Sequence, residues 1–417
     1  MTTTYPPEAY IFDSPENHAM LNAESHELLH FGHQFPAPGG GSYWLDDNGA
    51  PDPSHGIQTW ITCRMAHVYS LGAIYGEPDA ETLVDRALDG LRGPLHDNAN
   101  GGWYPSIQPD GTPEHGKTCY THAFVILAAT SATLIGRPGA DALLDEALAT
   151  YNNWFWDDER GLAVDTWNTT FTTLDPYRGL NANMHTVEAF LAVADVTGKE
   201  CYRTRAGRII DHVVDWASTN NWRIPEHFTT DWVPDLEFNR DKPDDPFKPY
   251  GATPGHGIEW ARLIIQFATS CHRSPQEKAT LTDMAEKLFH RAIEDAWNVG
   301  GNTGLAYTTD WEGHPVVTDR MHWTLAEAVN TSAVLAAVTG KQEYRDHYAA
   351  FWQYIDDCLI DHERGSWFHQ LDCRNHVIGT VWPGKSDLYH ALQCTLIPRL
   401  TPSMSVAPAL KQALAGR

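Results

Sequence analysis

The sequence has no apolar run of the length that a membrane-spanning helix needs. Residues 1–7 carry neither a basic stretch nor an apolar core, so we expect no secretory signal and a cytoplasmic location. Basic residues are scarce, with 29 Lys and Arg against 54 Asp and Glu and a formal net charge of -25. Such a field repels phosphate backbones and anionic lipids, so nucleic-acid and membrane partners are not expected.

Cysteine is also sparse, and its spacing is uninformative. The seven cysteines form no C-x-x-C pair, and an odd number scattered along the chain is typical of reduced thiols rather than a disulfide framework. We therefore expect mostly buried thiols without a catalytic role. They stand at positions 63, 119, 201, 271, 358, 373 and 394.

A short, aromatic, strand-like stretch returns about every 60 residues, and a long helical pattern follows each copy, which is typical of a repeat architecture. Three of the turns that follow these stretches contain Gly, at Gly49, Gly111 and Gly313, which suits a hairpin turn because Gly tolerates positive φ. The stretches are Gly40 to Trp44, Gly101 to Tyr104, Arg160 to Ala163, Asn221 to Ile224, Gly304 to Tyr307 and Gly365 to Phe368.

Each repeat predicts a hairpin, an inner helix and an outer helix. Six such pairs predict an all-α fold, a closed (α/α)6 barrel of six inner and six outer helices with short β-hairpins in the rim loops. The inner helices are expected at 55–75, 115–136, 178–197, 253–271, 319–339 and 384–397. The outer helices are expected at 16–33, 80–95, 140–156, 199–218, 275–297 and 342–360.

The repeat runs almost end to end without a linker, so we expect residues 1–417 to form a single catalytic domain. One segment, 225–252, is irregular and contains five prolines. A loop of this length in a compact domain is usually functional or disordered. We expect this insertion to form a wall or lid at the mouth of a pocket.

Polar and aromatic residues recur near the start of every expected inner helix, where unpaired charges would be costly to bury. A single histidine in such a place is more often structural than catalytic. Their recurrence in six repeats nevertheless favours one polar cup at one end of the barrel. These residues include Trp60, Arg64, Tyr120, Asn181, His185, His256, Glu259, His322, Trp323, Glu327, Lys385, Asp387 and His390.

Three segments carry a family resemblance. They are Tyr177 to Ala189 with Asn181-Ala182-Asn183-Met184-His185, Pro254 to Ala261 with His256 and Glu259, and Trp382 to His390. Together they resemble the N-acylglucosamine 2-epimerase superfamily, and within it the aldose–ketose isomerase branch. The resemblance implies an enzyme without metal or cofactor that interconverts an aldose and the 2-ketose through a cis-enediol. The aldose it implies is D-mannose, with D-lyxose as a further candidate.

The resemblance also implies roles for individual residues. His256 and His390 match the catalytic pair, with His390 as the proton shuttle between C1 and C2, and Glu259 is expected to orient His256. Histidine suits such a shuttle because its ordinary pKa is about 6.5. The expected substrate-binding residues are Arg64, His185, Trp60, Tyr120, Asn181, Trp323, Glu327 and Asp387.

Several alternatives stay open at this point. A sugar 2-epimerase of the N-acylglucosamine or cellobiose type would use a similar cup, and a sulfoquinovose isomerase would add a cation, for which Lys385 or Arg240 could serve. A glycoside hydrolase would use a carboxylate pair, and a non-catalytic sugar-binding or protein-interaction module or a metalloenzyme is also conceivable. The oligomeric state is left open. Candidate hydrolase carboxylates are Glu188, Glu226, Glu259 and Glu327.

Overall fold

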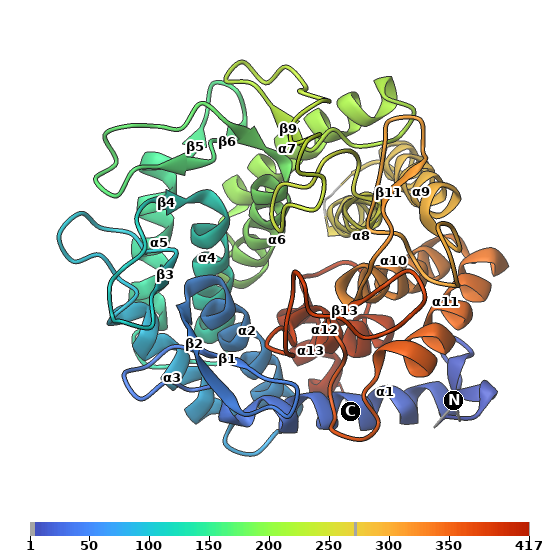
Figure 1. The fold of residues 1–417 in the computed structure, drawn as a ribbon, viewed down its shortest axis with the longest axis horizontal. Helices are drawn as coiled ribbons and strands as arrows, with labels where there is room; N and C mark the ends of the chain where they lie inside the picture. The colour runs from blue at the N-terminus through green and yellow to red at the C-terminus, as the bar shows by residue number, and fades with distance from the viewer. Residues whose placement is uncertain (1–4, 271–272, 417) are drawn as a thin grey trace.

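The computed structural model describes residues 5–270 and 273–416, in which two concentric rings of helices follow the chain around a common centre (Figure 1). Residues 1–4, 271–272 and 417 lie outside the described residues. The prediction of a reduced thiol at Cys271 falls on one of them. The inner ring consists of α2 Thr59–Tyr75, α4 Cys119–Leu134, α6 Leu180–Thr197, α8 Pro254–Ser270, α10 His322–Thr339 and α12 Tyr389–Leu396. The outer ring consists of α1 Pro15–Phe31, α3 Ala80–Arg92, α5 Ala140–Trp154, α7 Glu200–Thr219, α9 Pro275–Ala296 and α11 Gln342–Tyr354.

The two rings differ in how their helices are buried. In α8 every residue from Pro254 to Ala268 is buried, as expected of a helix surrounded by others. In α3 the buried residues lie mainly on one face, with Leu83, Ala87 and Leu91 turned inward. Each inner helix packs against the next, and α12 contacts α2 to close the ring. The predicted all-α (α/α)6 barrel is therefore confirmed, whereas the single-domain interpretation stays a prediction.

In the described residues, short strand pairs link four of the repeats to the following one at the end of the barrel where the inner helices begin, and a single bridge between Ala252 and Thr309 links the fourth to the fifth. The strand that enters an inner helix pairs with a strand of the next unit, as Lys117 with Trp167 and Arg178 with Phe228. The backbone N–H of Lys385 donates to the carbonyl of Leu45 and so joins the sixth unit to the first. The pairs of this kind are β2 Pro51–Gln58 with β3 Ser106–Ile107, β4 Lys117–Thr118 with β7 Thr166–Trp167, β8 Arg178–Gly179 with β9 His227–Phe228, and β12 Arg320–Met321 with β13 Gln370–Leu371.

The predicted hairpin turns are present, but the strand-like stretches are only partly strands. Gly49, Gly111 and Gly313 have φ values of 77°, 84° and 94°. The first and third stretches contain strands, whereas the second, fifth and sixth contain only single bridge residues, at Trp103, Leu305 and Trp367. The fourth stretch, Asn221 to Ile224, is no strand because Asn221 and Trp222 adopt positive φ, so the prediction of six strand-like stretches is wrong for this one and only partly right for the other three. The remaining strands are β1 Tyr43–Leu45, β5 Trp156–Asp157, β6 Leu162–Ala163, β10 Thr308–Thr309 and β11 Pro315–Val317.

A thirteenth helix, α13 Val406–Ala415, was not predicted from the repeat. It packs against α2, α4, α6 and α12 at the end of the barrel opposite the rim strands. Asp195 accepts hydrogen bonds from the backbone N–H and the hydroxyl of Ser405, both at 2.7 Å. The far end of the barrel is therefore covered by the C-terminal segment. Short helical turns occur at Pro7–Tyr10, Gly32–Gln34, Ile355–Leu359 and Ile397–Arg399.

The sixth inner helix starts later than predicted. It begins at Tyr389, so Lys385 and Asp387, expected within the helix, precede it. The physical reason is the burial of Lys385 against the preceding unit, where Nζ donates to Asp361 Oδ2 at 2.6 Å and to the carbonyl of Gly365.

Half of the cysteines in the described residues are buried, which is fewer than the sequence predicts. The six cysteines in the described residues are free thiols, of which Cys63, Cys119 and Cys394 are buried and Cys201 is exposed. No helix in the described part of the chain combines the length and the apolar character that a bilayer crossing needs.

Candidate functional site

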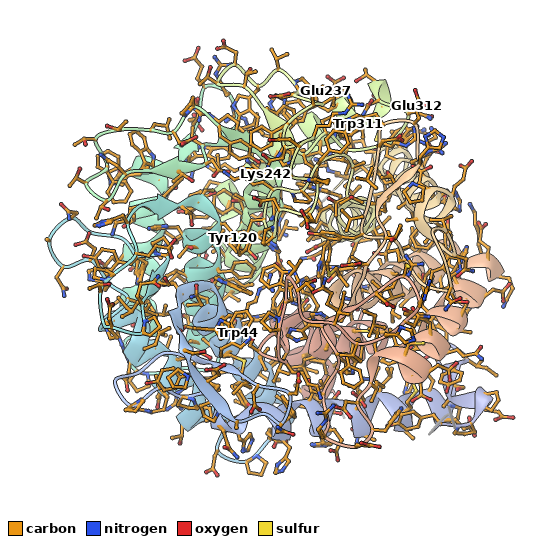
Figure 2. All side chains as sticks on the ribbon, viewed as in Figure 1. Trp44, Tyr120, Glu237, Lys242, Trp311 and Glu312 are labelled. Atoms are coloured by element: carbon orange, nitrogen blue, oxygen red, sulfur yellow. The ribbon has the colours of Figure 1, made fainter. Side chains whose placement is uncertain are left out.

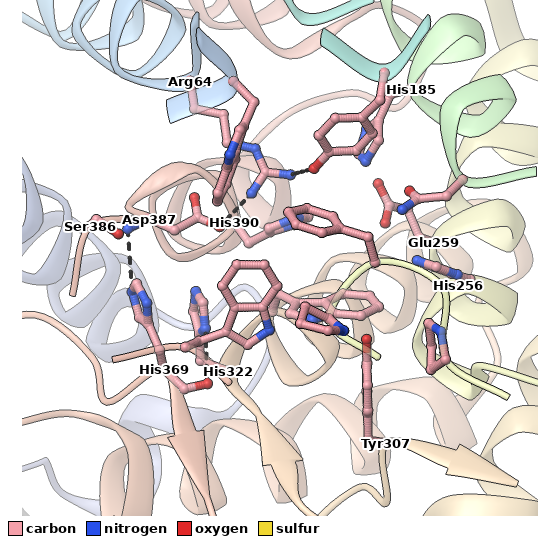
Figure 3. A pocket seen from close by; sticks show the side chains of 18 of the residues that line it. Arg64, His185, His256, Glu259, Tyr307, His322, His369, Ser386, Asp387 and His390 are labelled. Atoms are coloured by element: carbon pink, nitrogen blue, oxygen red, sulfur yellow. Dashed lines mark hydrogen bonds and ion pairs between the residues drawn. The ribbon is translucent and has the colours of Figure 1, made fainter. Parts of the chain in front are cut away.

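A cavity lies where the inner helices begin, and it is lined by side chains from all six of them (Figure 3). Ten of the eleven predicted site residues line it, and the eleventh, Glu327, lies fully buried behind His390. The lining residues are Trp44, Trp60, Arg64, Tyr120, Asn181, His185, Pro246, Phe247, Pro249, His256, Glu259, Tyr307, His322, Trp323, His369, Trp382, Ser386, Asp387 and His390.

Arg64, on α2, is the fixed cation of this cavity. Its guanidinium donates to Asp387 and, through Nη2, to the Tyr120 hydroxyl at 3.1 Å. It lies 4.6 Å from the ring centre of Phe124 and 4.8 Å from that of Tyr389, in cation–π range. Burial disfavours the charged form of Asp387, but Arg64 and nearby imidazoles hold the pKa of its carboxyl well below the usual range. The site therefore contains an ionised Arg–Asp pair.

His390, on α12, is held by a buried chain of polar groups. Its Nδ1 lies 3.0 Å from Oε1 of Glu327, and Oε2 of Glu327 accepts from Arg262 Nε at 2.7 Å. Burial acts against the charge on Glu327, yet Arg262 and His390 keep the pKa of this carboxyl below its ordinary value. An ionised carboxylate can only accept, so in the neutral ring Nδ1 carries the proton and Nε2 keeps a lone pair. This tautomer gives His390 a free basic nitrogen.

His256, on α8, has an equivalent partner from a different part of the chain. Its Nδ1 lies 3.0 Å from Oε1 of Glu226, which precedes β9 at the barrel rim. The prediction that Glu259 orients His256 is therefore wrong, because Glu226 holds this imidazole. Glu226 stands at the start of the irregular segment 225–252, where no helical spacing relates it to His256. Its acidic character alone had suggested a hydrolase carboxylate.

Glu259 has a different character from the other acids. It is 1% exposed, and its Oε1 has no hydrogen-bond partner while lying 3.5 Å from Arg262 Nη2. Burial, followed by the charge of Glu327, raises its pKa well above the ordinary value. This direction favours the protonated form of Glu259, which lines the cavity and in that form can donate a proton or a hydrogen bond.

His185, on α6, belongs to a third polar chain. Its Nδ1 lies 3.4 Å from Oε2 of Glu188, which also accepts from the Tyr389 hydroxyl. Burial lowers the pKa of His185 to about 4. The imidazole is therefore neutral near pH 7 and can bind a substrate hydroxyl without adding charge.

Aromatic side chains surround the mouth of the cavity. Phe247, from the segment 225–252, lies with its ring centre 6.3 Å from Trp60, 6.2 Å from Tyr120 and 5.4 Å from Trp382. Figure 2 shows Tyr120 and Trp44 on the inner side of the rim, with Glu237 and Glu312 near its outer edge. Apolar ring faces of this kind suit the C–H faces of a sugar.

Neither cation considered for a sulfonated sugar reaches the site. Lys385 is fully buried against Asp361, as described above, and does not line the cavity. Arg240 is exposed and donates to Glu237 at 2.5 Å. The expectation that one of them could serve as the added cation is wrong, because both are engaged elsewhere.

Sequence reasoning missed several lining residues, among them Trp44, Phe247, Tyr307, His369 and Ser386. Trp44 and Tyr307 belong to the repeated aromatic stretches, so the repeat itself was a usable signal for them. The others come from loops, where no periodicity marks the direction of a side chain.

Two buried groups have residue types that can bind metals, namely His185, Glu188 and Glu259, and Glu259, Glu327 and His390. In both, Arg262 supplies positive charge, since it is bonded to Glu327 and lies 3.5 Å from Glu259. A divalent cation would have to compete with this guanidinium, so the donor set fits a metal poorly.

Comparison with known proteins places this site in context. Residues 40–394 match the family described as N-acylglucosamine 2-epimerase (GlcNAc 2-epimerase). The chain is 42% identical over 395 residues to the D-mannose isomerase of Thermobifida fusca, covering 94% of this chain and 96% of that protein. It is 41% identical over 408 residues to the D-mannose isomerase of Pseudomonas cannabina pv. alisalensis, covering 97% and 96%. A crystal structure of a D-mannose isomerase superposes with a TM-score of 0.86 at 26% identity, over 95% of this chain and 99% of that one.

Proposed function

Since the chain belongs to the N-acylglucosamine 2-epimerase family, we propose that it is an aldose–ketose isomerase that interconverts D-mannose and D-fructose. The observation that carries the mechanism is the arrangement of His256 and His390. Both imidazoles line one cavity, and each is held through Nδ1 by a buried carboxylate, so each can present Nε2 to a bound sugar.

In the proposed reaction, His390 Nε2 removes the proton from C2 of the open-chain aldose and returns a proton to C1. The O2 hydroxyl loses its proton as the carbonyl moves to C2, and O1 gains one, so atoms and charge balance across the cis-enediol. Arg64 is suited to stabilise the oxygen that carries negative charge in the intermediate, because Asp387 and Tyr120 fix its guanidinium beforehand.

His256 and Glu259 supply the proton transfers at oxygen. A base and a neutral acid are both needed to open the pyranose ring, since O1 loses a proton and O5 gains one. His256, held by Glu226, is the proposed base, and the neutral Glu259 is the proposed donor. We also propose that no metal takes part in the reaction, because Arg262 lies among the buried acids. Activity should therefore survive dialysis against a chelator.

The test is an NMR assay of the purified protein with D-mannose in heavy water. We expect D-fructose as the product, with solvent deuterium incorporated at C1 wherever the shuttled proton has exchanged. D-glucose as the first product would identify a 2-epimerase instead, and release of monosaccharide from a disaccharide would identify a hydrolase. In the same assay, His390→Ala should lose about 10²-fold or more of the rate. A variant of the exposed His314, His314→Ala, is the matched control.

A further inference from the structure

A second polar cavity, the far cavity, lies at the end of the barrel that α13 covers. Its polar lining consists mainly of His67, Glu188, Arg262, Gln266 and Ser405, and none of these residues lines the sugar cavity. Its volume of about 10 Å³ is room for roughly one water molecule. Residues Ser405 to Pro408, where α13 begins, form its outer wall, so the C-terminal segment closes it.

His67, on α2, brings a hydrogen-bond acceptor to the far cavity. The Ser131 hydroxyl donates to the carbonyl of Leu127 at 2.9 Å, so it accepts from Nδ1 of His67, which lies 2.7 Å away. Burial lowers the pKa of this imidazole to about 4, so the ring is neutral near pH 7 and Nε2 keeps its lone pair. Nε2 has no hydrogen-bond partner, although the residue is only 3% exposed. A buried polar atom of this kind indicates a bound partner.

Arg262, on α8, brings a charged donor to the same cavity. Its Nε donates to Oε2 of Glu327 at 2.7 Å, whereas its Nη2 makes no hydrogen bond and the residue is 3% exposed. Burial acts against the charge on Arg262, but three carboxylates raise its pKa, so the guanidinium stays a cation. These carboxylates are those of Glu327, Glu188 and Glu259.

The polar groups of the far cavity match the hydrogen bonds of one water molecule. Gln266 lies one turn beyond Arg262 on α8, and its Nε2 donates to Ser405 Oγ at 3.1 Å, which leaves Oε1 as an acceptor. A water molecule can donate to Nε2 of His67 and to Oε1 of Gln266 while it accepts from Arg262. Buried waters in proteins typically have about three such partners.

We propose that the far cavity binds one water molecule, through which His67 acts as a positioning residue for His390. The water ties His67 and Gln266 to Arg262. Arg262 carries the effect onward, because its Nε holds Glu327, and Glu327 holds Nδ1 of His390 at 3.0 Å. The expected effect on catalysis rests on the proposed function, in which His390 moves the proton between C2 and C1.

Two substitutions of His67 separate the acceptor from the space that the ring fills. His67→Phe keeps a ring but removes the acceptor, so we expect kcat with D-mannose to fall about fivefold to tenfold while KM stays within about twofold. His67→Gln restores an acceptor near the position of Nε2 and should bring kcat back to within about twofold of the wild type. Val406→Ala, an apolar part of the same lining, is the matched control for packing and should leave kcat unchanged.

The pH profile of kcat gives a readout that a packing defect alone would not move. Burial acts to raise the pKa of the Glu327 carboxyl, and Arg262 holds it below the ordinary value. A guanidinium displaced in His67→Phe would hold it less, so the acid limb of the profile should move to higher pH in this variant and stay in place in Val406→Ala. The charged and titratable groups around Glu327 are Arg262 and Glu259 on α8 and His390 and Cys394 on α12.

Crystal structures of the wild type and of His67→Phe separate this inference from the proposed function. We expect a water molecule between His67 and Arg262 in the wild type, and a longer distance from Arg262 to Glu327 in the variant. If the wild type isomerises no sugar but the variant shows this displacement, the tie from His67 to Arg262 stands and the isomerase proposal fails.

Three results would overturn the inference: no water between His67 and Arg262, an unchanged bond from Arg262 to Glu327 in His67→Phe, or wild-type kcat in that variant. If His67→Phe does not fold, Gln266→Met takes its place in the kinetic and structural measurements. This substitution keeps the length of the side chain and removes another partner of the water, so the same losses are expected.

Discussion

At the scale of single residues, the two proposed proton carriers are held in the same way by carboxylates of different origin. His390 is held by Glu327 from the neighbouring helix α10, whereas His256 is held by Glu226 from a rim loop. A carboxylate that fixes the tautomer also stabilises the imidazolium that forms when the ring takes up a proton. The two acids near His256 therefore differ in task, since Glu226 is its partner and Glu259 is neutral.

Substitution of the two glutamates separates these tasks. Glu226→Gln keeps the size of the side chain but removes the charge that supports His256, so we expect kcat to fall by roughly 10- to 100-fold with a smaller change in KM. Glu259→Gln keeps a hydrogen-bond donor but cannot transfer a proton, so loss of the proposed acid of ring opening should lower kcat by about 10²-fold. Steady-state kinetics with D-mannose measure both. A loss of less than about twofold in Glu259→Gln would mean that Glu259 is not the proton donor of ring opening.

At the scale of elements, the segment 225–252 is tied to the rim on both sides of its acidic stretch. Trp311, at the tip of the β10–β11 hairpin, donates from Nε1 to the carbonyl of Leu236 at 2.6 Å, and Figure 2 shows Trp311 between Glu237 and Glu312. Nζ of Lys248 lies 3.7 Å from the ring centre of Tyr177. These anchors place Phe247 at the mouth of the cavity. Closure of the segment over a substrate stays a prediction.

Removing the Phe247 ring tests the contribution of this segment. Phe247→Ala should raise KM by about threefold to tenfold, from roughly 1 kcal/mol of lost aromatic contact, and change kcat less because the groups that move protons are untouched. Val233→Ala, an exposed apolar position in the same segment, should leave both constants unchanged. If kcat of Phe247→Ala fell while KM held, the ring would act in a step after binding.

At the scale of the whole molecule, the closed ring buries imidazoles in surroundings that favour their neutral form. Burial lowers the pKa of His67, His185 and His322 to about 4 in the folded protein. In the unfolded chain the ordinary pKa is about 6.5. The unfolded state therefore binds more protons between these values, and the contribution of these groups to stability is complete above pH 6.5 and is lost as the pH falls toward 4.

His67 lies outside the sugar cavity and allows a clean test of this linkage. Its Nδ1 is hydrogen-bonded to the Ser131 hydroxyl at 2.7 Å, and Nε2 has no partner. We expect His67→Gln to be less stable than the wild type at pH 7, with a difference that shrinks below pH 6.5 by about 1.4 kcal/mol per pH unit. Urea unfolding at pH 7, 6 and 5 measures this. Parallel curves would show that His67 is not kept neutral by the fold.

The sequence by itself determined the ring of paired helices and most of the cavity. Trp60, Tyr120, Asn181, His256 and Trp323 stand within the first turns of inner helices, and the period of the helix fixes their direction once the barrel closes. Local periodicity and a repeat of about 60 residues were sufficient for this, because both can be read along the chain without knowledge of tertiary contacts.

Only the tertiary structure decided what the loops contribute. Glu226 meets His256, Phe247 reaches the mouth, and Ser386 and His369 line the cavity, while Lys385 turns away to Asp361. Loop direction depends on contacts with distant units, such as the bond from Lys385 N–H to Leu45 that joins the ends of the ring. A side chain in such a segment has no period to orient it, so its partner is set by ring closure rather than by spacing along the chain.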